Sequence, residues 1–95
     1  MNISVGLFEW DEVKERQNFE KHKVDFSTAS QAFADPRRVL AVDELHSEFE
    51  DRYFCLGKVG DQVLTVRFTK RGNRIRILGA GYWRKGKSLY EKENR

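Results

Sequence analysis

The segment "DELHSEFEDR", residues 43–52, combines the residue types that proton transfer at a phosphodiester requires. It contains His46, the acidic residues Asp43 and Glu50, and the cation Arg52. Histidine can move a proton near neutral pH, and a carboxylate can orient the imidazole or replace it. RNA cleavage needs a base for the 2′-hydroxyl, an acid for the departing 5′-oxygen and cations for the transition-state charge. We therefore treat His46, Glu50 and Arg52 as candidate catalytic residues, with a purely structural role as the alternative.

Two further arginines lie in a predicted β-hairpin around Gly72. The alternation in "VLTVRFT" and "RIRIL" places Arg67 and Arg76 on the same sheet face, opposite the apolar residues of both strands. A two-residue loop at residues 71–72 would set the two arginines directly opposite each other. A loop at residues 72–73 would make them diagonal neighbours. In both registers the sequence predicts two guanidinium groups on one outward surface.

Like charges at this separation destabilise a sheet by roughly a few tenths of a kcal/mol or more. An internal carboxylate could offset this repulsion, and Glu48 and Glu50 are the candidates. A bound phosphate could also offset it, since guanidinium groups bind phosphate oxygens in a bidentate manner. Arg67 and Arg76 are accordingly candidates for a phosphate-binding catalytic centre.

Positive charge accumulates towards the C-terminal end. From residue 70 onward nine Lys/Arg against two Glu give +7, whereas nine Lys/Arg against thirteen Asp/Glu before it give −4, for a total of +3. Such asymmetry is typical of nucleic-acid partners, with a solvated face as the alternative. The stretch "YWRKGK" mixes aromatic and basic residues as single-stranded RNA binding does, although we expect Trp83 to close the core. The candidate RNA-binding residues are Lys70, Arg71, Tyr82, Arg84, Lys85 and Lys87.

No metal or other cofactor is expected, because His22, His46 and Cys55 lack ligand-like spacing. Cys55 has no partner for an internal disulfide and is interpreted as a packed residue in a reducing compartment. The chain has no apolar run long enough to span a membrane and no signal-peptide pattern, so we expect a cytoplasmic protein without a membrane partner.

The elements that must position these residues suggest a single α+β domain over residues 1–95. We predict a short strand at 7–10, a helix at 12–22 capped by Asp11, and a second helix at 28–34 capped by Asp25 or Ser27. Strands follow at 39–43, 52–59, 62–69 and 74–79, and a short helix closes the chain. The expected architecture is two N-terminal helices packed on one face of a three- to four-stranded antiparallel sheet.

One face of the first predicted helix carries Lys14, Asn18, Lys21 and His22. This pattern usually marks a solvated stripe, although Asn18 could tie the end of the helix to a loop. We interpret His22 as a group that complements the dipole at the C-terminal end of the helix.

The runs "FEWDEVKERQNFEKHKVDFSTASQAFADP", "DELHSEFEDR", "LTVRFTKRGNRIRI" and "YEKEN" resemble the BrnT family of bacterial toxins. The resemblance extends from Phe8 to Asn94 and implies a fold like that of RelE-type ribonuclease toxins. It also implies a metal-independent endoribonuclease that arrests translation. The implied partner is a BrnA-like antitoxin with a ribbon-helix-helix domain, through which the complex would bind operator DNA. The implied site residues are Asp43, His46, Ser47, Glu50, Arg52, Arg67 or Arg71, and Arg76.

The sequence departs from the family pattern after "RIRI". Many members carry an arginine and a glutamate where this chain has Gly81 and Lys87. The resemblance then implies either that Arg84 or Lys85 supplies the missing cation or that cleavage is lost. The alternative function is a non-catalytic basic module that binds an acidic protein or nucleic acid.

Overall fold

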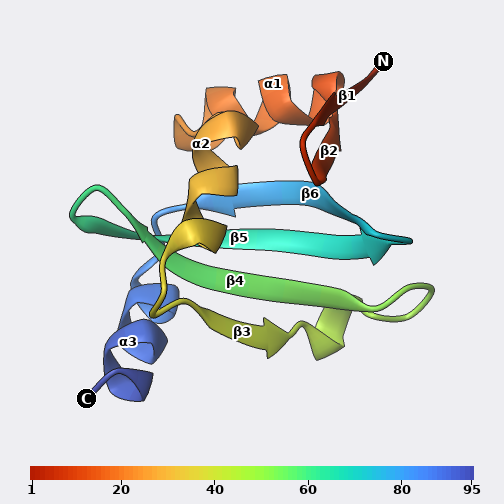
Figure 1. The fold of residues 1–95 in the computed structure, drawn as a ribbon. Helices are drawn as coiled ribbons and strands as arrows, with labels where there is room; N and C mark the ends of the chain where they lie inside the picture. The colour runs from red at the N-terminus through yellow and green to blue at the C-terminus, as the bar shows by residue number, and fades with distance from the viewer.

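The computed structural model describes residues 1–95 and contains a six-stranded sheet in the order β1-β2-β6-β5-β4-β3 (Figure 1). Strands β2 and β6 run parallel, and all other neighbouring strands are antiparallel. The α+β class is confirmed, but the predicted sheet of three or four antiparallel strands is wrong in strand number and direction. The strands are β1 (Asn2–Val5), β2 (Phe8–Asp11), β3 (Val39–Val42), β4 (Arg52–Val59), β5 (Gln62–Arg71) and β6 (Arg74–Gly81).

The difference arises at the N-terminus. Residues 2–5 form β1, which pairs with β2 across a turn at Gly6, where φ is +59°. Residues 2–5, Asn-Ile-Ser-Val, alternate polar and apolar types over four residues only, and Ile3 alone is partly buried in this edge strand. Strand β2 then joins the sheet in parallel beside β6, with Phe8 opposite Ile75. A parallel pair joined by a long crossover leaves no local signal in the sequence.

The helices agree more closely with the prediction. Asp11 caps α1 by accepting a hydrogen bond from the Val13 N–H, and Asp25, rather than Ser27, caps α2 through the Thr28 N–H. The second helix begins two residues earlier than predicted and continues as a 3-10 turn, and the C-terminal helix begins at Arg84. The helical segments are α1 (Glu12–His22), α2 (Phe26–Ser30), η1 (Gln31–Ala34), η2 (Glu44–His46) and α3 (Arg84–Glu93).

The two central hairpins turn at the glycines where the sequence predicts a turn. The β4–β5 turn contains Gly60 at φ +66°, and the β5–β6 turn contains Gly72 at φ +60°; both are left-handed conformations that glycine adopts readily. Arg71 pairs with Arg74, so the loop occupies residues 72–73. The second of the two predicted registers is therefore correct at the turn.

The core lies between one face of the sheet and the α2–η1 segment, which crosses that face in Figure 1. Gly57 allows this close approach, since a Cβ at that position would collide with the carbonyl of Ala32. Helix α3 packs on the other face, with Tyr90 against Leu56 and Val63 at one end of the strands. Helix α1 buries no residue and lies along the β6 side. The prediction that both N-terminal helices pack on one face therefore holds for α2 only.

The prediction that Cys55 is a packed residue is confirmed. The thiol is fully buried, and this burial raises its pKa to about 12. It stays protonated at neutral pH and is a poor nucleophile there. No helix is both long and apolar enough to cross a membrane.

A polar link joins α3 to the end of η1. Asp35 accepts hydrogen bonds from the Tyr90 hydroxyl at 2.6 Å, the Lys58 N–H at 2.8 Å and the Arg37 N–H at 2.9 Å. Burial alone would raise the pKa of Asp35, but these hydrogen bonds outweigh it and hold the pKa below its ordinary value. Burial and the bond to Asp35 raise the pKa of Tyr90. The link therefore needs an ionised carboxylate and a neutral phenol.

We predict that Asp35→Asn lowers the free energy of unfolding at pH 7 by about 1–3 kcal/mol, because three donors lose a charged acceptor. Since the folded-state pKa is lowered, the carboxylate stabilises fully above its ordinary pKa and less as pH falls through the folded-state value. The difference from wild type, measured by urea unfolding, should therefore narrow towards acidic pH. Asp61→Asn, at an exposed turn, is the control and should show no difference. A difference in the free energy of unfolding between Asp35→Asn and wild type that does not change with pH would contradict this account.

Candidate functional site

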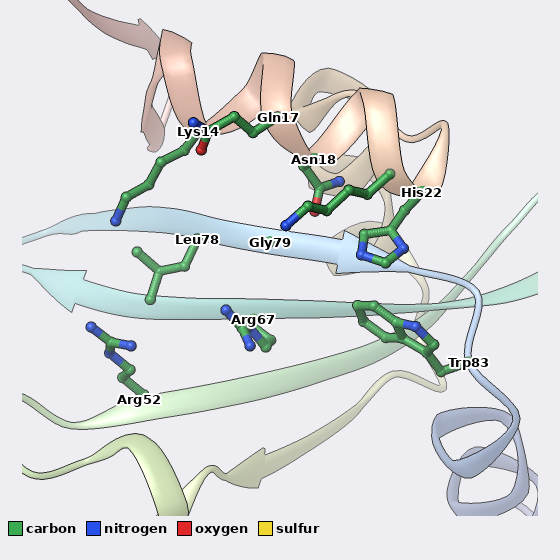
Figure 2. A pocket seen from close by; sticks show the side chains of 10 residues that line it. Lys14, Gln17, Asn18, His22, Arg52, Arg67, Leu78, Gly79 and Trp83 are labelled. Carbon is green, nitrogen blue, oxygen red and sulfur yellow. The ribbon is translucent and has the colours of Figure 1, made fainter.

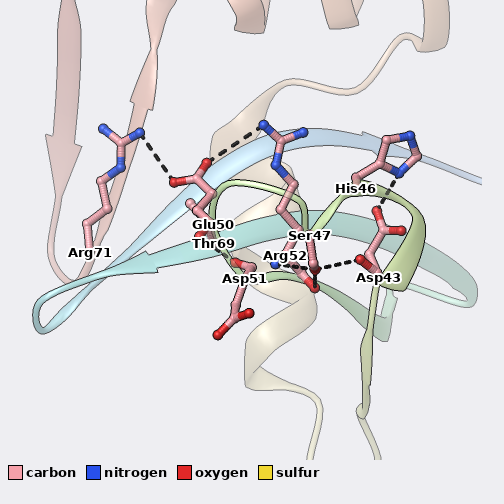
Figure 3. A network of polar contacts seen from close by, with 8 residues as sticks. All are labelled: Asp43, His46, Ser47, Glu50, Asp51, Arg52, Thr69 and Arg71. Carbon is pink, nitrogen blue, oxygen red and sulfur yellow. Dashed lines mark hydrogen bonds and ion pairs between the residues drawn. The ribbon is translucent and has the colours of Figure 1, made fainter.

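The loop between β3 and β4 is held by a network of hydrogen bonds around Asp43 (Figure 3). The buried Asp43 carboxylate lies 2.9 Å from Nδ1 of His46, and its backbone oxygen accepts from the Ser47 hydroxyl at 2.7 Å. Ser47 Oγ also accepts from the Arg52 N–H at 2.9 Å. The spacing of Asp, His, Ser and Arg in "DELHSEFEDR" thus allows these hydrogen bonds to close the loop.

This loop sets the direction of His46. Asp43 engages Nδ1, which leaves Nε2 as the nitrogen available to a substrate, and the side chain is 50% exposed. Figure 3 shows the imidazole and the Arg52 guanidinium projecting on the same side of the loop. A carboxylate-oriented imidazole beside a guanidinium can transfer a proton next to a bound anion.

Glu50 lies between two cations. Its carboxylate oxygens are 3.7 Å from Arg52 Nη2 and 3.7 Å from Arg71 Nη2. At this distance the carboxylate orients both guanidinium groups without a tight hydrogen bond. Glu50 is therefore the internal carboxylate for Arg52 and Arg71, and it does not contact Arg67 or Arg76.

A cavity of about 370 Å³ opens beneath α1, against the sheet face that α2 leaves free (Figure 2). Five of its lining residues are Lys, Arg or His, and none is acidic. Figure 2 shows Arg52 and Arg67 reaching into this space from β4 and β5, across from the side chains of α1. We call this cavity the basic cleft; its lining residues are Lys14, Gln17, Asn18, Lys21, His22, Arg52, Arg67, Leu78, Gly79 and Trp83.

Asn18 fixes the position of α1 over the sheet. Its amide donates to the carbonyls of Ala80 at 2.9 Å and Val24 at 3.0 Å, and its oxygen accepts from the Ala80 N–H at 3.1 Å. The predicted role of Asn18 as a tie is confirmed by these bonds, and the other three residues of the stripe, Lys14, Lys21 and His22, are solvent-exposed as predicted. Lys14, Lys21 and His22 of the same helix face line the basic cleft. His22 therefore does more than complement the helix dipole.

A β-bulge determines where Arg67 lies. The register between β5 and β6 shifts after Phe68–Ile77, so that Arg67 pairs with Gly79 and skips Leu78. The guanidinium rests over Gly79, since a Cβ there would lie 3.5 Å from Arg67 Nε and 3.6 Å from Asn18 Oδ1. Arg67 makes no hydrogen bond or ion pair within the chain, and Nε of Arg52 is buried without a partner. Arg67 thus offers the basic cleft a guanidinium available to an anion, whereas the buried Nε of Arg52 is not accessible to one.

Of the two predicted arrangements of Arg67 and Arg76 on one sheet face, the diagonal one is confirmed and the directly opposite one is wrong, although the bulge moves Arg67 opposite Gly79. Arg76 pairs with Thr69 and with Glu9 of the parallel neighbour, and its Nη1 lies 2.7 Å from Glu9 Oε2. The offsetting carboxylate is thus Glu9, which the sequence did not suggest because the β2–β6 pairing was not predicted. Arg76 does not line the basic cleft, whereas Arg52, a diagonal neighbour of Arg67 across β4 and β5, does.

The candidate RNA-binding residues of the C-terminal half lie outside the basic cleft. Lys70 lies over the ring of Tyr53, and Lys85 lines a separate, largely apolar groove of about 540 Å³ between β3, β4 and α3. Trp83 is 37% exposed, so the expectation that it closes the core is wrong. It lines both cavities instead. The other exposed residues of the set are Arg71, Tyr82, Arg84 and Lys87.

We predict opposite effects on stability for the two arginines of the hairpin. Arg76→Gln should lower the free energy of unfolding by about 1–3 kcal/mol, because it leaves the largely buried Glu9 carboxylate with a weaker partner. Arg67→Gln should leave stability unchanged or raise it at low salt, since it removes an unpaired cation from a positive cluster. Urea unfolding of both variants in the same buffer measures the contrast. Equal losses would show that Arg67 is a structural residue.

No group of three or more His, Cys, Asp or Glu residues is arranged to hold a metal ion. Among curated proteins, none matches this sequence. The family model described as "Ribonuclease toxin, BrnT, of type II toxin-antitoxin system" matches residues 10–86. This range contains both the loop around His46 and every residue of the basic cleft. The chain therefore belongs to the BrnT family of ribonuclease toxins.

Proposed function

We propose that this protein is a metal-independent endoribonuclease that binds a phosphodiester of RNA in the basic cleft and cleaves it beside His46. The observation that carries the proposal is a cavity with five cationic or imidazole side chains and no carboxylate, which shares Arg52 with the neighbouring pocket that the oriented His46 lines. RNA is the substrate class that such a cavity suits in a family of ribonuclease toxins. Lys14 and Lys21 would hold phosphates on either side of the one that reacts.

Arg67 and Arg52 would bind the reacting phosphate. Arg67 has no internal partner, so its guanidinium can donate to two phosphate oxygens without first breaking an ion pair. Arg52 keeps only a 3.7 Å contact to Glu50, which leaves donors for an anion. Negative charge on the phosphorus oxygens increases as the 2′-oxygen attacks, and fixed cations stabilise that transition state more than the ground state.

His46 would move the proton. Nε2 accepts the proton of the 2′-hydroxyl as the 2′-oxygen bonds to phosphorus, while Asp43 stabilises the resulting imidazolium through Nδ1–H. The bond to the 5′-oxygen breaks, and that oxygen takes a proton from a general acid or from water. The products are a 2′,3′-cyclic phosphate and a 5′-hydroxyl. Glu50 would position Arg52 and Arg71. Arg76 would have a positioning role only, because its ion pair with Glu9 holds β6, the strand that carries Gly79, against β2.

In the cell, we propose that RNA cleavage in the cytoplasm inhibits translation and that an antitoxin neutralises it. A type II toxin family implies such a protein partner. We propose a BrnA-like antitoxin with a ribbon-helix-helix domain, so that operator DNA is bound by the antitoxin and not by the basic cleft. The exposed basic residues Arg84, Lys85 and Lys87 of α3 remain candidates for contacts with longer RNA.

We predict that the purified chain, free of antitoxin, cleaves single-stranded RNA in the presence of EDTA. Arg67→Gln should reduce the cleavage rate about 10²–10³-fold, the loss expected for removing one donor that stabilises developing charge. His46→Gln should reduce it about 10²–10⁴-fold. The measurement is the rate of appearance of cyclic-phosphate ends on a labelled oligoribonucleotide.

Arg16→Gln is the matched control, because Arg16 is an exposed cation of α1 that does not line the basic cleft. It should cleave at the wild-type rate. If the intact protein binds RNA but leaves it whole, the protein is a binding module and the enzymatic proposal fails. If EDTA alone abolishes cleavage, the metal-independent mechanism fails.

A further inference from the structure

Trp83 presents an indole ring to the basic cleft. The two tryptophans of the chain differ sharply, since Trp10 is 2% exposed in the core and Trp83 is 37% exposed. Figure 2 shows Trp83 at the end of the basic cleft below His22, with Arg67 further along the sheet. Apart from the imidazole of His22, the indole is the one aromatic ring among the lining residues. A large apolar ring exposed among cations is suited to a ligand that is both flat and anionic.

Gly81 and His22 fix the orientation of this ring. The indole lies directly on Gly81, where an added Cβ would come within 2.6–2.9 Å of three ring atoms. The His22 imidazole meets the indole at 5.0 Å between ring centres and at 78°, an edge-to-face arrangement. Because glycine below and histidine beside it restrict the ring, the indole is held in place before any ligand binds.

We infer that Trp83 is a stacking site for one unpaired nucleobase of the RNA, next to the phosphate held by Arg67. This inference rests on the proposed function and adds a residue that selects single-stranded RNA. Base–aromatic stacking accepts any base and requires that the base be unpaired. The cations of the basic cleft bind the backbone of the same nucleotide, so stacking and phosphate binding reinforce each other.

The test uses a 2′-O-methyl tetranucleotide, which cannot be cleaved, and the same backbone with abasic sugars. The intrinsic fluorescence of the intact protein should be quenched by the tetranucleotide and not by the abasic strand, since Trp10 is shielded in the core. Trp83→Ala should weaken binding of the tetranucleotide about 5- to 150-fold, the range measured for loss of one stacked base. Binding of the abasic strand should not change.

Gly81→Ala is the second variant, because its methyl group would displace the indole while leaving Trp83 in the chain. It should reproduce the loss seen with Trp83→Ala. Phe19→Ala removes an exposed aromatic ring of α1 that does not line the basic cleft, and it should bind both strands as wild type does.

The outcomes separate this inference from the proposed function. Trp83 is not a stacking site if Trp83→Ala weakens binding of the tetranucleotide and of the abasic oligonucleotide equally. The same conclusion follows if the abasic oligonucleotide binds, and quenches the fluorescence, as strongly as the tetranucleotide. Trp83 would then be a residue that only packs against Gly81 and His22. Cleavage of RNA without quenching overturns the inference alone. Base-dependent quenching without cleavage overturns the enzymatic proposal alone.

Discussion

The basic cleft depends on the side-chain amide of Asn18. Strand β2 covers the edge of β6 only as far as Ile77, so the backbone of Ala80 would otherwise have no partner on that side. The Asn18 amide supplies both missing hydrogen bonds to Ala80 and a third to Val24. Helix α1 buries none of its residues, and apolar packing therefore contributes little to its placement. Polar contacts of Asn18, with those of Glu15 to the Trp10 indole and the Phe26 N–H, thus set the distance between the cations of α1 and those of the sheet.

The distribution of carboxylates explains why positive charge remains in this cleft. Glu9 pairs with Arg74 and Arg76 on one side, and Glu50 pairs with Arg52 and Arg71 on the other. The bulge shifts Arg67 opposite Gly79, where it has no acidic neighbour in the sheet. Local neutralisation at both ends stabilises the strands, while the middle keeps a guanidinium whose repulsion from its neighbours is relieved when an anion binds.

The sequence predicted what local chemistry determines. Asp11 and Asp25 as caps, the strand at residues 52–59 and the turn around Gly72 follow from patterns of a few residues. The features that the sequence could not predict depend on pairing between segments that are distant along the chain. The parallel contact of β2 with β6, and with it the Glu9–Arg76 ion pair, has no local signature. The role of Lys14 and Lys21 was missed for the same reason, because a stripe of cations on a helix looks alike whether it faces water or a cavity.

Glycine at position 81 and tryptophan at position 83 are physically coupled. Any side chain at 81 carries a Cβ, and that atom would collide with the indole, so an arginine there and the present position of Trp83 exclude each other. Neither Arg84 nor Lys85 lines the basic cleft, so neither supplies a cation there. The cleft still contains Lys14, Lys21, Arg52 and Arg67. In this chain glycine at position 81 thus serves the placement of the indole ring, and under the proposed function phosphate binding falls to the residues of α1, β4 and β5.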